Sequence, residues 1–226
     1  MARMSERIEQ APACIADGVF FTMPPVLSRG RHELSRDDVL AIHRERLMIA
    51  ATELLASEGY RGVGVREITA RARISRAAFY AVFDDKDACV FAAYERFIEV
   101  LLARLAAVMV PSATATVTVN SFLEAYLSTL QLDLVAARAF HVEFESLGAA
   151  ARKSRRAGTT RLAALIRDAQ AAISDIPPAP LIDHIGGIYA VRDLVSDALD
   201  QSAAPELLSL LPVMKLWTTR LLTLQR

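Results

Sequence analysis

Arginine side chains gather in one short stretch of the sequence. Between residues 61 and 76 there are five arginines against a single acid, Glu67. The five are Arg61, Arg66, Arg71, Arg73 and Arg76. Guanidinium groups bind phosphate oxygens through charge-assisted hydrogen bonds, and phosphate contacts supply much of the affinity of proteins for DNA. The cluster therefore indicates a phosphate-binding face. On charge alone, a helical hairpin with a solvated arginine face remains the alternative.

Side chains that could catalyse a reaction or hold a metal are few. His141 and Glu145 stand one helical turn apart, with Glu143 nearby, but no other set of histidine, cysteine or carboxylate at ligand spacing joins them. We interpret them as a partly buried polar pair or a ligand contact. A second basic run, residues 152–156, is interpreted as a solvated helix face or loop, with a second nucleic-acid patch as the alternative. The sequence has no nucleophile elbow, phosphate loop or dinucleotide fingerprint, so we predict no catalysis, metal or cofactor.

Composition limits the class of protein. The chain has 226 residues, 53% of them hydrophobic, and its 26 basic residues balance 26 acidic ones. This length supports a core. The high apolar fraction and ordinary charge fraction exclude a wholly disordered chain, and the balanced charge excludes a uniformly basic DNA-coating protein. Cys14 and Cys89 match neither a disulfide scaffold nor a zinc module, which is typical of a reducing cytosol. No apolar run is long enough to span a membrane. We expect a cytoplasmic protein without a membrane partner.

Apolar residues recur at spacings of three and four, which predicts an all-α protein. Ser35 should cap a helix that ends at Gly59. Two short helices follow at about 65–72 and 76–83, joined by a turn of three to four residues. A long helix then spans about 85–108. Later helices are expected at about 119–131, 133–146, 149–172, 181–200 and 205–225, with Pro212 kinking or restarting the last one.

The two short helices have the form of a helix-turn-helix, in which the second helix enters the major groove of DNA. Ser75 should cap that second helix, and Phe79 and Phe83 should point inward. Its exposed side chains would be small, so Arg76 alone could form a bidentate contact to guanine. We therefore expect part of the sequence specificity to come from the basic segment 29–31, which could insert into a minor groove. A solubilising tail is the alternative interpretation of that segment.

Residues 44–95 resemble the DNA-binding domain of the TetR family of bacterial transcriptional regulators. The matching residues are Ala50, Ala51, Leu54, Gly59, Tyr60, Val65, Arg66, Glu67, Ile68, Ala72, Ile74, Ser75, Arg76, Phe79, Tyr80, Phe83 and Lys86. The segment 27–39, with its RGRH run, resembles the arm of one TetR subgroup. The resemblance implies an N-terminal three-helix helix-turn-helix domain and a C-terminal helical ligand-binding and dimerisation domain. We expect an N-terminal extension and basic arm over 1–35 and these two domains over 36–88 and 89–226.

The resemblance, together with the basic arm, gives a set of expected DNA contacts. They are Arg29, Arg31, Gly64, Val65, Ser75, Arg76, Ala77, Ala78, Tyr80, Ala81 and Lys86. The chain departs from the family pattern at three places. Gly64 and Val65 stand where a threonine commonly opens the first helix of the motif, Arg73 replaces the turn glycine, and Val82 replaces a frequent histidine. If the backbone at Arg73 needs a positive φ, the strain is about 1 kcal/mol.

The resemblance also implies that the C-terminal half binds a small molecule and forms the dimer. The pocket should lie among the helices at about 85–108, 119–131, 133–146 and 149–172. Its candidate lining residues are Phe97, Leu101, Phe122, Tyr126, Phe140, His141 and Phe144, although an aromatic stripe is also typical of plain core. The dimer should form through the last two helices. The candidates there are Ile185, Ile188, Val195, Leu210, Met214, Trp217 and Leu221.

These expectations combine into one functional prediction. The chain should be a homodimeric regulator, a repressor that binds a palindromic DNA operator and is released by a small apolar or amphipathic effector. One alternative is a helical small-molecule-binding or enzymatic protein that never touches DNA. Another is a TetR-like regulator that has no natural ligand and responds only to partner proteins.

Overall fold

The computed structural model describes residues 14–24, 34–109, 114–173 and 177–224, with side chains as far as residue 218 at the C-terminal end. Within these ranges the one pairing of β type is an isolated bridge between Asp17 and Phe21. The prediction of an all-α fold is confirmed. Over the same ranges, no helix combines the length and the apolarity that crossing a bilayer requires.

Helix α1, Arg36–Gly62, begins with a reciprocal cap. The Ser35 hydroxyl accepts a hydrogen bond from the Asp38 amide at 3.1 Å, and the Asp38 carboxylate accepts one from the Ser35 amide at 3.1 Å. The two bonds satisfy backbone amides that the first turn would otherwise leave unpaired. Gly59 has φ 66° inside α1, a left-handed conformation that glycine adopts without strain. The helix therefore kinks at the glycine and ends three residues later than expected.

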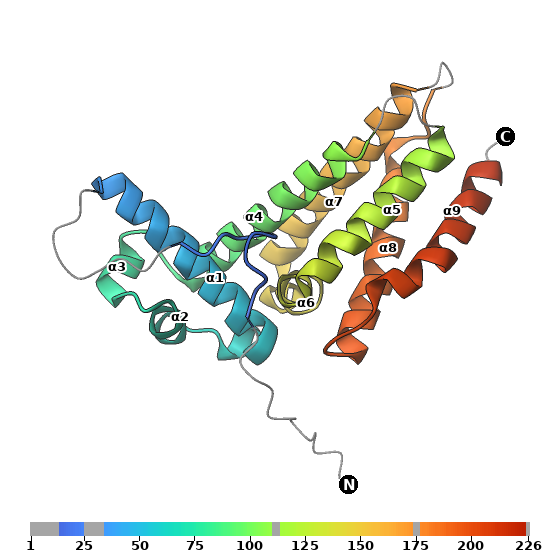
Figure 1. Ribbon diagram of the computed structural model, residues 1–226. Helices are drawn as coiled ribbons and strands as arrows, with labels where there is room; N and C mark the ends of the chain where they lie inside the picture. The colour runs from blue at the N-terminus through green and yellow to red at the C-terminus, as the bar shows by residue number, and fades with distance from the viewer. Residues whose placement is uncertain (1–13, 25–33, 110–113, 174–176, 225–226) are drawn as a thin grey trace, which may run out of the picture.

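Three further helices connect the two ends of the molecule. Helix α2 spans Val65–Ala72, α3 spans Arg76–Tyr80 and α4 spans Lys86–Ala107. In Figure 1, α1, α2 and α3 form one end, and α4 runs from this end into the remaining helices. The long helix α4 is thus the element that the helix-turn-helix and the rest of the chain share.

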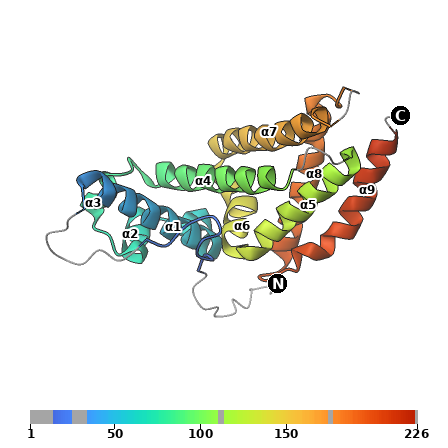
Figure 2. The ribbon, with the colours of Figure 1, turned by 45° about the horizontal axis from the view of Figure 1, so that its top comes forward.

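The remaining elements form the larger part of the molecule. They are α5 (Ala115–Leu132), α6 (Leu134–His141), α7 (Ala149–Ala171), α8 (Leu181–Gln201) and α9 (Leu211–Leu224), with 3-10 segments at Glu143–Leu147 and Leu207–Leu210. The helix expected over 133–146 is therefore split, since α6 ends at His141. Pro212 lies in the first turn of α9, where a missing amide removes no helical hydrogen bond. Figure 2 shows α9 at the end opposite to α3.

Aromatic rings of α4 and α6, and of the 3-10 segment after α6, fill the centre of the larger part. The ring of Tyr94 stacks on that of Phe144 with 4.2 Å between centroids. The rings of Phe97 and Phe140 lie 5.0 Å apart. These four side chains are nearly inaccessible to water. Burial of large aromatic surfaces is a major source of stability, so this cluster fixes α4 against α6.

Residues 14–24, here called the N-terminal strap, cross the junction between α1 and the larger part of the molecule (Figure 1). Phe20 and Phe21 are 2% and 1% exposed. The ring of Phe20 lies 4.5 Å from the ring of Phe97 on α4. The strap therefore contributes two phenylalanines to the core.

Hydrogen bonds hold the strap to both parts. The amide of Ile15 donates to the carboxylate of Glu53 on α1 at 3.1 Å. The guanidinium of Arg104 on α4 donates to the carbonyl of Gly18 at 3.1 Å. The strap thus ties α1 to α4.

Candidate functional site

Helices α2 and α3 are joined by a three-residue turn whose first residue is strained. Arg73 has φ 56° and ψ 45°, and it is the only residue other than glycine with a positive φ in the described ranges. The amide of Ile74 donates to the carbonyl of Thr69 at 3.0 Å, which closes the end of α2. The left-handed conformation costs an arginine on the order of 1 kcal/mol relative to a glycine. The turn therefore has the backbone for which the family pattern uses glycine.

Helix α3 presents one face to solvent and anchors the other in the core. Phe79 and Phe83 are buried at 0% and 5% exposure, and their rings lie 6.0 Å apart. The exposed residues are Ser75, Arg76, Ala77, Tyr80 and Ala81, and Ala78 is half-buried. The Ser75 hydroxyl oxygen accepts a hydrogen bond from the Ala78 amide at 3.1 Å, which leaves its own proton able to donate outward. The predicted DNA-contacting residues of this helix thus share one accessible surface.

The five clustered arginines do not all belong to that surface. Arg61, Arg66, Arg73 and Arg76 are exposed. Arg71 instead turns toward the body, where its Nε lies 2.5 Å from the carboxylate of Glu53. Because Glu53 also accepts the Ile15 amide of the strap, the side chain of Arg71 supports the domain junction. The charge pattern of the sequence could not separate this structural arginine from the others.

The start of α2 carries an acid near the positions where a phosphate contact was expected. The carboxylate of Glu67 folds back toward Gly64, so close that a Cβ added at Gly64 would lie 2.4 Å from its Oε2. Arg66, and secondly the backbone amide of Glu67, lower the pKa of this carboxyl. The negative charge is therefore present at neutral pH and opposes a phosphate at Gly64 or Val65.

Lys86, another predicted phosphate contact, is engaged inside the protein. Its Nζ donates to the carbonyl of Val63 at 2.9 Å and lies 3.9 Å from the centre of the Tyr60 ring. The Tyr60 hydroxyl donates to Asp87 at 2.7 Å, and this bond is the main reason why the pKa of Tyr60 rises to about 12. The first turn of α4 is thus clamped to the end of α1, immediately before α2. An ammonium has three donors, so Lys86 retains capacity for a phosphate oxygen.

The arm residues Arg29 and Arg31 lie outside the described residues. What precedes them is described: the strap is held to α1 and α4, and the amide of Thr22 donates to Glu45 of α1 at 3.2 Å. The chain re-enters the described structure at Leu34, beside the start of α1. Described residues therefore stand on both sides of the arm, in the strap and at the start of α1.

The expected effector pocket is almost filled by the protein's own side chains. Five of its predicted residues, which are Phe97, Leu101, Tyr126, Phe140 and His141, line a cavity of only about 20 Å³. Phe144 is buried against Tyr94. A cavity of this size has room for about one water molecule. The aromatic stripe thus packs as core in this structure, and its assignment to an effector pocket stays a prediction.

A hydrogen-bonded polar group lies beside that small cavity. His141 Nδ1 lies 3.1 Å from the carbonyl of Ala137, and its Nε2 lies 2.6 Å from the Tyr126 hydroxyl. A carbonyl only accepts, so Nδ1 carries the proton and the Nε2 of the neutral ring accepts from Tyr126. Burial, and secondly the charge of Arg192, lower the pKa of His141 well below its usual value. His141 is therefore a neutral core histidine.

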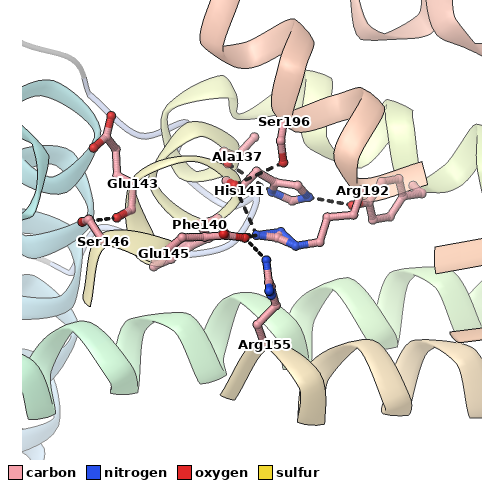
Figure 3. Close-up of polar contacts among 10 residues, drawn as sticks. Ala137, Phe140, His141, Glu143, Glu145, Ser146, Arg155, Arg192 and Ser196 are labelled. Carbon is pink, nitrogen blue, oxygen red and sulfur yellow. Dashed lines mark hydrogen bonds and ion pairs between the residues drawn. The ribbon is translucent and has the colours of Figure 1, made fainter. Parts of the chain in front are cut away.

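Arg192 supplies the buried charge of this group. It is 7% exposed, and its guanidinium lies 3.2 Å from the carbonyl of His141 and 3.2 Å from the Glu145 carboxylate. Figure 3 shows Glu145 between Arg192 and Arg155, with Glu143 turned away. His141 and Glu145 thus belong to one polar group without converging on a common ligand. Across the described residues, no three histidine, cysteine or carboxylate side chains come together as a metal site.

A second and larger cavity lies between α5, α7, α8 and α9. Its volume is about 440 Å³, within the range of small-molecule sites. Of the predicted ligand residues only Phe122 lines it. Residues that the sequence analysis did not assign to the pocket include Gln170, Asp183, His184, Gly186 and Gly187. The two adjacent glycines are the feature of the sequence that could have indicated this cavity, because they leave space beside a helix whose other residues carry side chains.

Several residues predicted for the dimer are part of the subunit core. The buried ones are Ile188, Val195 and Met214. Ile185, Leu210 and Trp217 are half-buried, and the side chain of Leu221 lies outside the described set. Apolar side chains that do face solvent on these elements are Ile182, Leu194, Leu208, Val213 and Leu216. Three of the predicted residues thus point into the subunit, because α8 and α9 also pack on α7 and α5, and the assignment of the dimer interface stays a prediction.

Comparisons with known proteins agree with this architecture. Residues 47–93 match the family model described as bacterial regulatory proteins, tetR family. Among curated protein sequences, none matches this chain. The fatty acid degradation regulator FadR of Bacillus halodurans has a similar structure, with a TM-score of 0.68, 12% identity, and coverage of 76% of this chain and 92% of that one.

Two further solved structures share the fold. FadR of Bacillus subtilis, solved in complex with stearoyl-CoA, has a TM-score of 0.65 at 15% identity and covers 75% of this chain and 94% of that one. A TetR-like transcriptional regulator of Rhodococcus sp. RHA1 has a TM-score of 0.62 at 18% identity, with 84% and 99% covered. The segment 47–93, from α1 to the first half of α4, is thus similar to the bacterial regulatory proteins of the tetR family, and the solved structures share the fold of the chain.

Proposed function

We propose that this chain is a homodimeric transcriptional regulator that binds a palindromic DNA operator and acts as a repressor released by a small apolar or amphipathic effector. The observation that carries the proposal is the exposed face of α3, with Arg76, Ala77, Tyr80 and Ala81 on the side opposite to the buried Phe79. A short helix held out in this way fits the major groove. Residues 36–88 would form the DNA-binding domain, and 89–226 the effector and dimerisation domain.

Only a few side chains of this face would contact the bases. The Arg76 guanidinium can form two hydrogen bonds to a guanine, and the methyl groups of Ala77, Ala78 and Ala81 can contact thymine methyl groups. Ser75, Tyr80 and Lys86 would bind the backbone. Arg29 and Arg31 would add contacts in a narrow minor groove next to the site.

Binding to DNA is tested by fluorescence anisotropy with duplexes from the region upstream of the gene. We expect an affinity that falls steeply as salt rises, because phosphate contacts release counterions. Arg76→Ala should weaken binding by about 5- to 150-fold, which corresponds to the roughly 1–3 kcal/mol of a bidentate base contact. Arg167→Ala is the matched control, since it removes an arginine charge from α7. Absence of binding at low salt would favour the alternative of a helical ligand-binding or enzymatic protein.

The basic arm needs a test that leaves the strap intact. Deleting residues 1–33 would also remove Phe20 and Phe21 from the core, so a loss of binding would have two causes. The double variant Arg29→Ala with Arg31→Ala avoids this problem. It should weaken operator binding and reduce the preference for A·T flanks. Unchanged affinity together with an unchanged flank preference would assign the arm to solubility alone.

The proposed dimer would form through the solvent-facing apolar side chains of α8 and α9. Val213 and Leu216 are 51% and 52% exposed. A second copy would cover them and would present two α3 helices about 34–36 Å apart, as successive major grooves require. Leu216→Glu should give monomers in analytical ultracentrifugation. Val117→Glu, at a 49% exposed residue of α5, should leave the dimer intact.

Effector release is tested separately from DNA binding. Thermal shift against a metabolite library should reveal compounds that raise the melting temperature, because a ligand stabilises the state it binds. Since the similar FadR of Bacillus subtilis was solved with stearoyl-CoA, long-chain acyl compounds are a rational first group. A compound that both stabilises the protein and dissociates the operator complex is the expected result. If no compound does so, a regulator without a natural ligand is favoured.

A further inference from the structure

The 440 Å³ cavity has the size and shape of a site for a small molecule. Helices α5, α7, α8 and α9 each contribute to its lining. The larger apolar side chains of the lining are those of Phe122, Leu123, Ile166, Ile188 and Trp217, and two valines, Val119 and Val191, accompany them. Ligand sites are typically concave, mostly apolar and about 300–1000 Å³ in volume. The walls therefore suit an apolar body rather than a polar metabolite.

Polar groups collect where α7 and the start of α8 meet the cavity. His184 Nε2 lies 2.7 Å from the side-chain oxygen of Gln170, and its Nδ1 lies 3.2 Å from the carbonyl of Pro180. Gln170 is 8% exposed, and Asp183 lies next to His184 in the first turn of α8. Among the described residues of the lining, Asp183 is the only carboxylate and none is an arginine or a lysine. A head group at this end meets hydrogen-bonding groups and a negative charge.

Two glycines leave room in the wall. A Cβ added at Gly186 or at Gly187 would meet no heavy atom within 4 Å, and both residues line the cavity. Neither glycine has a positive φ, so α8 does not need them for backbone geometry. Side chains at these positions would occupy space that the fold leaves empty.

The cavity is distinct from the exposed apolar residues proposed for the dimer. Ile182, Leu194, Val213 and Leu216 face solvent and do not line it. A second copy on those residues therefore need not compete with a ligand in the cavity. Ile188 lines this cavity and also the small one beside His141, so it forms the wall between the two.

A path of contacting side chains leads from the cavity to α4. The ring of Phe122 stacks on Tyr126 at 6.0 Å, and the Tyr126 hydroxyl bonds to His141. The ring of His141 lies 5.8 Å from that of Phe97 on α4. Because α4 begins at the clamp between Lys86 and Val63, a shift of Phe122 has a packed route toward the helix-turn-helix.

We propose that this cavity, rather than the filled aromatic centre, is the effector site, and that it takes an amphipathic molecule with an apolar body and an uncharged or cationic hydrogen-bonding head beside Gln170, Asp183 and His184. The effector role of the bound molecule rests on the proposed function of the chain as a regulator. Binding itself does not depend on DNA. A carboxylate head is disfavoured because it would face the carboxylate of Asp183, and the described part of the lining carries no arginine or lysine.

Three probes with the same apolar chain test the site: decanol, decylamine and decanoate, titrated by calorimetry into the full-length protein. We expect decanol and decylamine to bind, and decanoate to bind more weakly than either. Asp183→Asn should weaken decylamine about two- to five-fold and leave decanol unchanged, as expected for an exposed charge pair. Equal binding of all three probes, or preferred binding of decanoate, would overturn the head-group assignment.

Gly187→Leu tests the location. Leucine favours the helix more than glycine does and should fill the cavity, so the variant should fold while decanol binds at least about tenfold more weakly, since packed interiors tolerate little extra volume. Gly187→Ala is the matched control and should retain most of the binding. A Gly187→Leu protein with native circular dichroism and undiminished binding would place the ligand elsewhere. If decanol binds but has no effect on an operator complex, the binding site is supported and only its role as the effector site is contradicted.

Discussion

The ring of Phe20 packs against the ring of Phe97, with 4.5 Å between their centroids and 37° between their planes. Phe20 belongs to the N-terminal strap and Phe97 to the middle of α4, so a segment that precedes the helix-turn-helix in sequence is part of the core behind it. Because Arg71 of α2 and the strap also meet at Glu53, the junction depends on residues from both parts.

Phe20→Ala should destabilise the protein. The side chain is 2% exposed, and removing a buried phenylalanine ring costs about 3–5 kcal/mol through lost burial and the remaining cavity. Urea denaturation followed by circular dichroism measures the free energy of unfolding. Met23→Ala, at a residue of the same strap that is 50% exposed, should change it by less than about 0.5 kcal/mol. Equal effects of both variants would show that the strap is not docked in solution.

Arg73→Gly should raise stability and lower DNA affinity. Glycine adopts φ 56° without strain, so the free energy of unfolding should rise by up to about 1 kcal/mol. The exposed guanidinium is lost at the same time, and with it a possible phosphate contact, so the salt dependence of operator binding should become shallower by about one ion. Arg73→Ala is the control that loses the charge but keeps the strain. If it matched glycine in stability, the backbone argument would be wrong.

Glu67→Gln should strengthen DNA binding. The substitution removes the negative charge that lies over the first turn of α2 and keeps the shape of the side chain. Repulsion of a phosphate near Gly64 is thereby reduced, and affinity should rise severalfold at low salt with a smaller gain at high salt. Anisotropy titrations at two salt concentrations measure both. Weaker binding by the glutamine variant would instead indicate that Glu67 orients Arg66 for DNA.

Stability should fall as the solution becomes more acidic than about pH 6.5, the usual pKa of histidine. Burial keeps the folded pKa of His141 far below that value, so only the unfolded chain takes up a proton there. Stability then rises with pH between the folded and the unfolded pKa, by up to about 1.4 kcal/mol per pH unit. His43, whose pKa is lowered more modestly by burial and by Arg46, acts in the same direction.

His141→Gln isolates this contribution. The variant should be less stable at pH 7, because the Tyr126 hydroxyl loses its partner. The slope of its unfolding free energy against pH should nevertheless be smaller between pH 6.5 and about 5, because unfolding of the variant takes up about one proton fewer. Urea midpoints at several pH values provide the slopes. Identical slopes for both proteins would mean that His141 is protonated in the folded state.

Most of the helices follow from the sequence itself. Ser35, Ser75 and Asp85 each cap the helix that begins next to them, and each bond reaches only three residues along the chain. Such caps and the apolar spacing of three and four depend on neighbours within about one helical turn. They could therefore be predicted together with the helix-turn-helix and the inward direction of Phe79 and Phe83.

The tertiary structure alone decided which faces of the helices are buried and where a cavity remains between them. Arg71 and Arg76 belong to the same arginine cluster in the sequence, but of the two only Arg71 forms an ion pair with the carboxylate of Glu53. Ile188 and Leu194 lie on the same helix, yet one is buried and the other faces solvent. The cavity joins Gln170 of α7 to Asp183 of α8 because these helices approach there. The angles between helices depend on interlocking side chains from distant segments, and local patterns do not encode them.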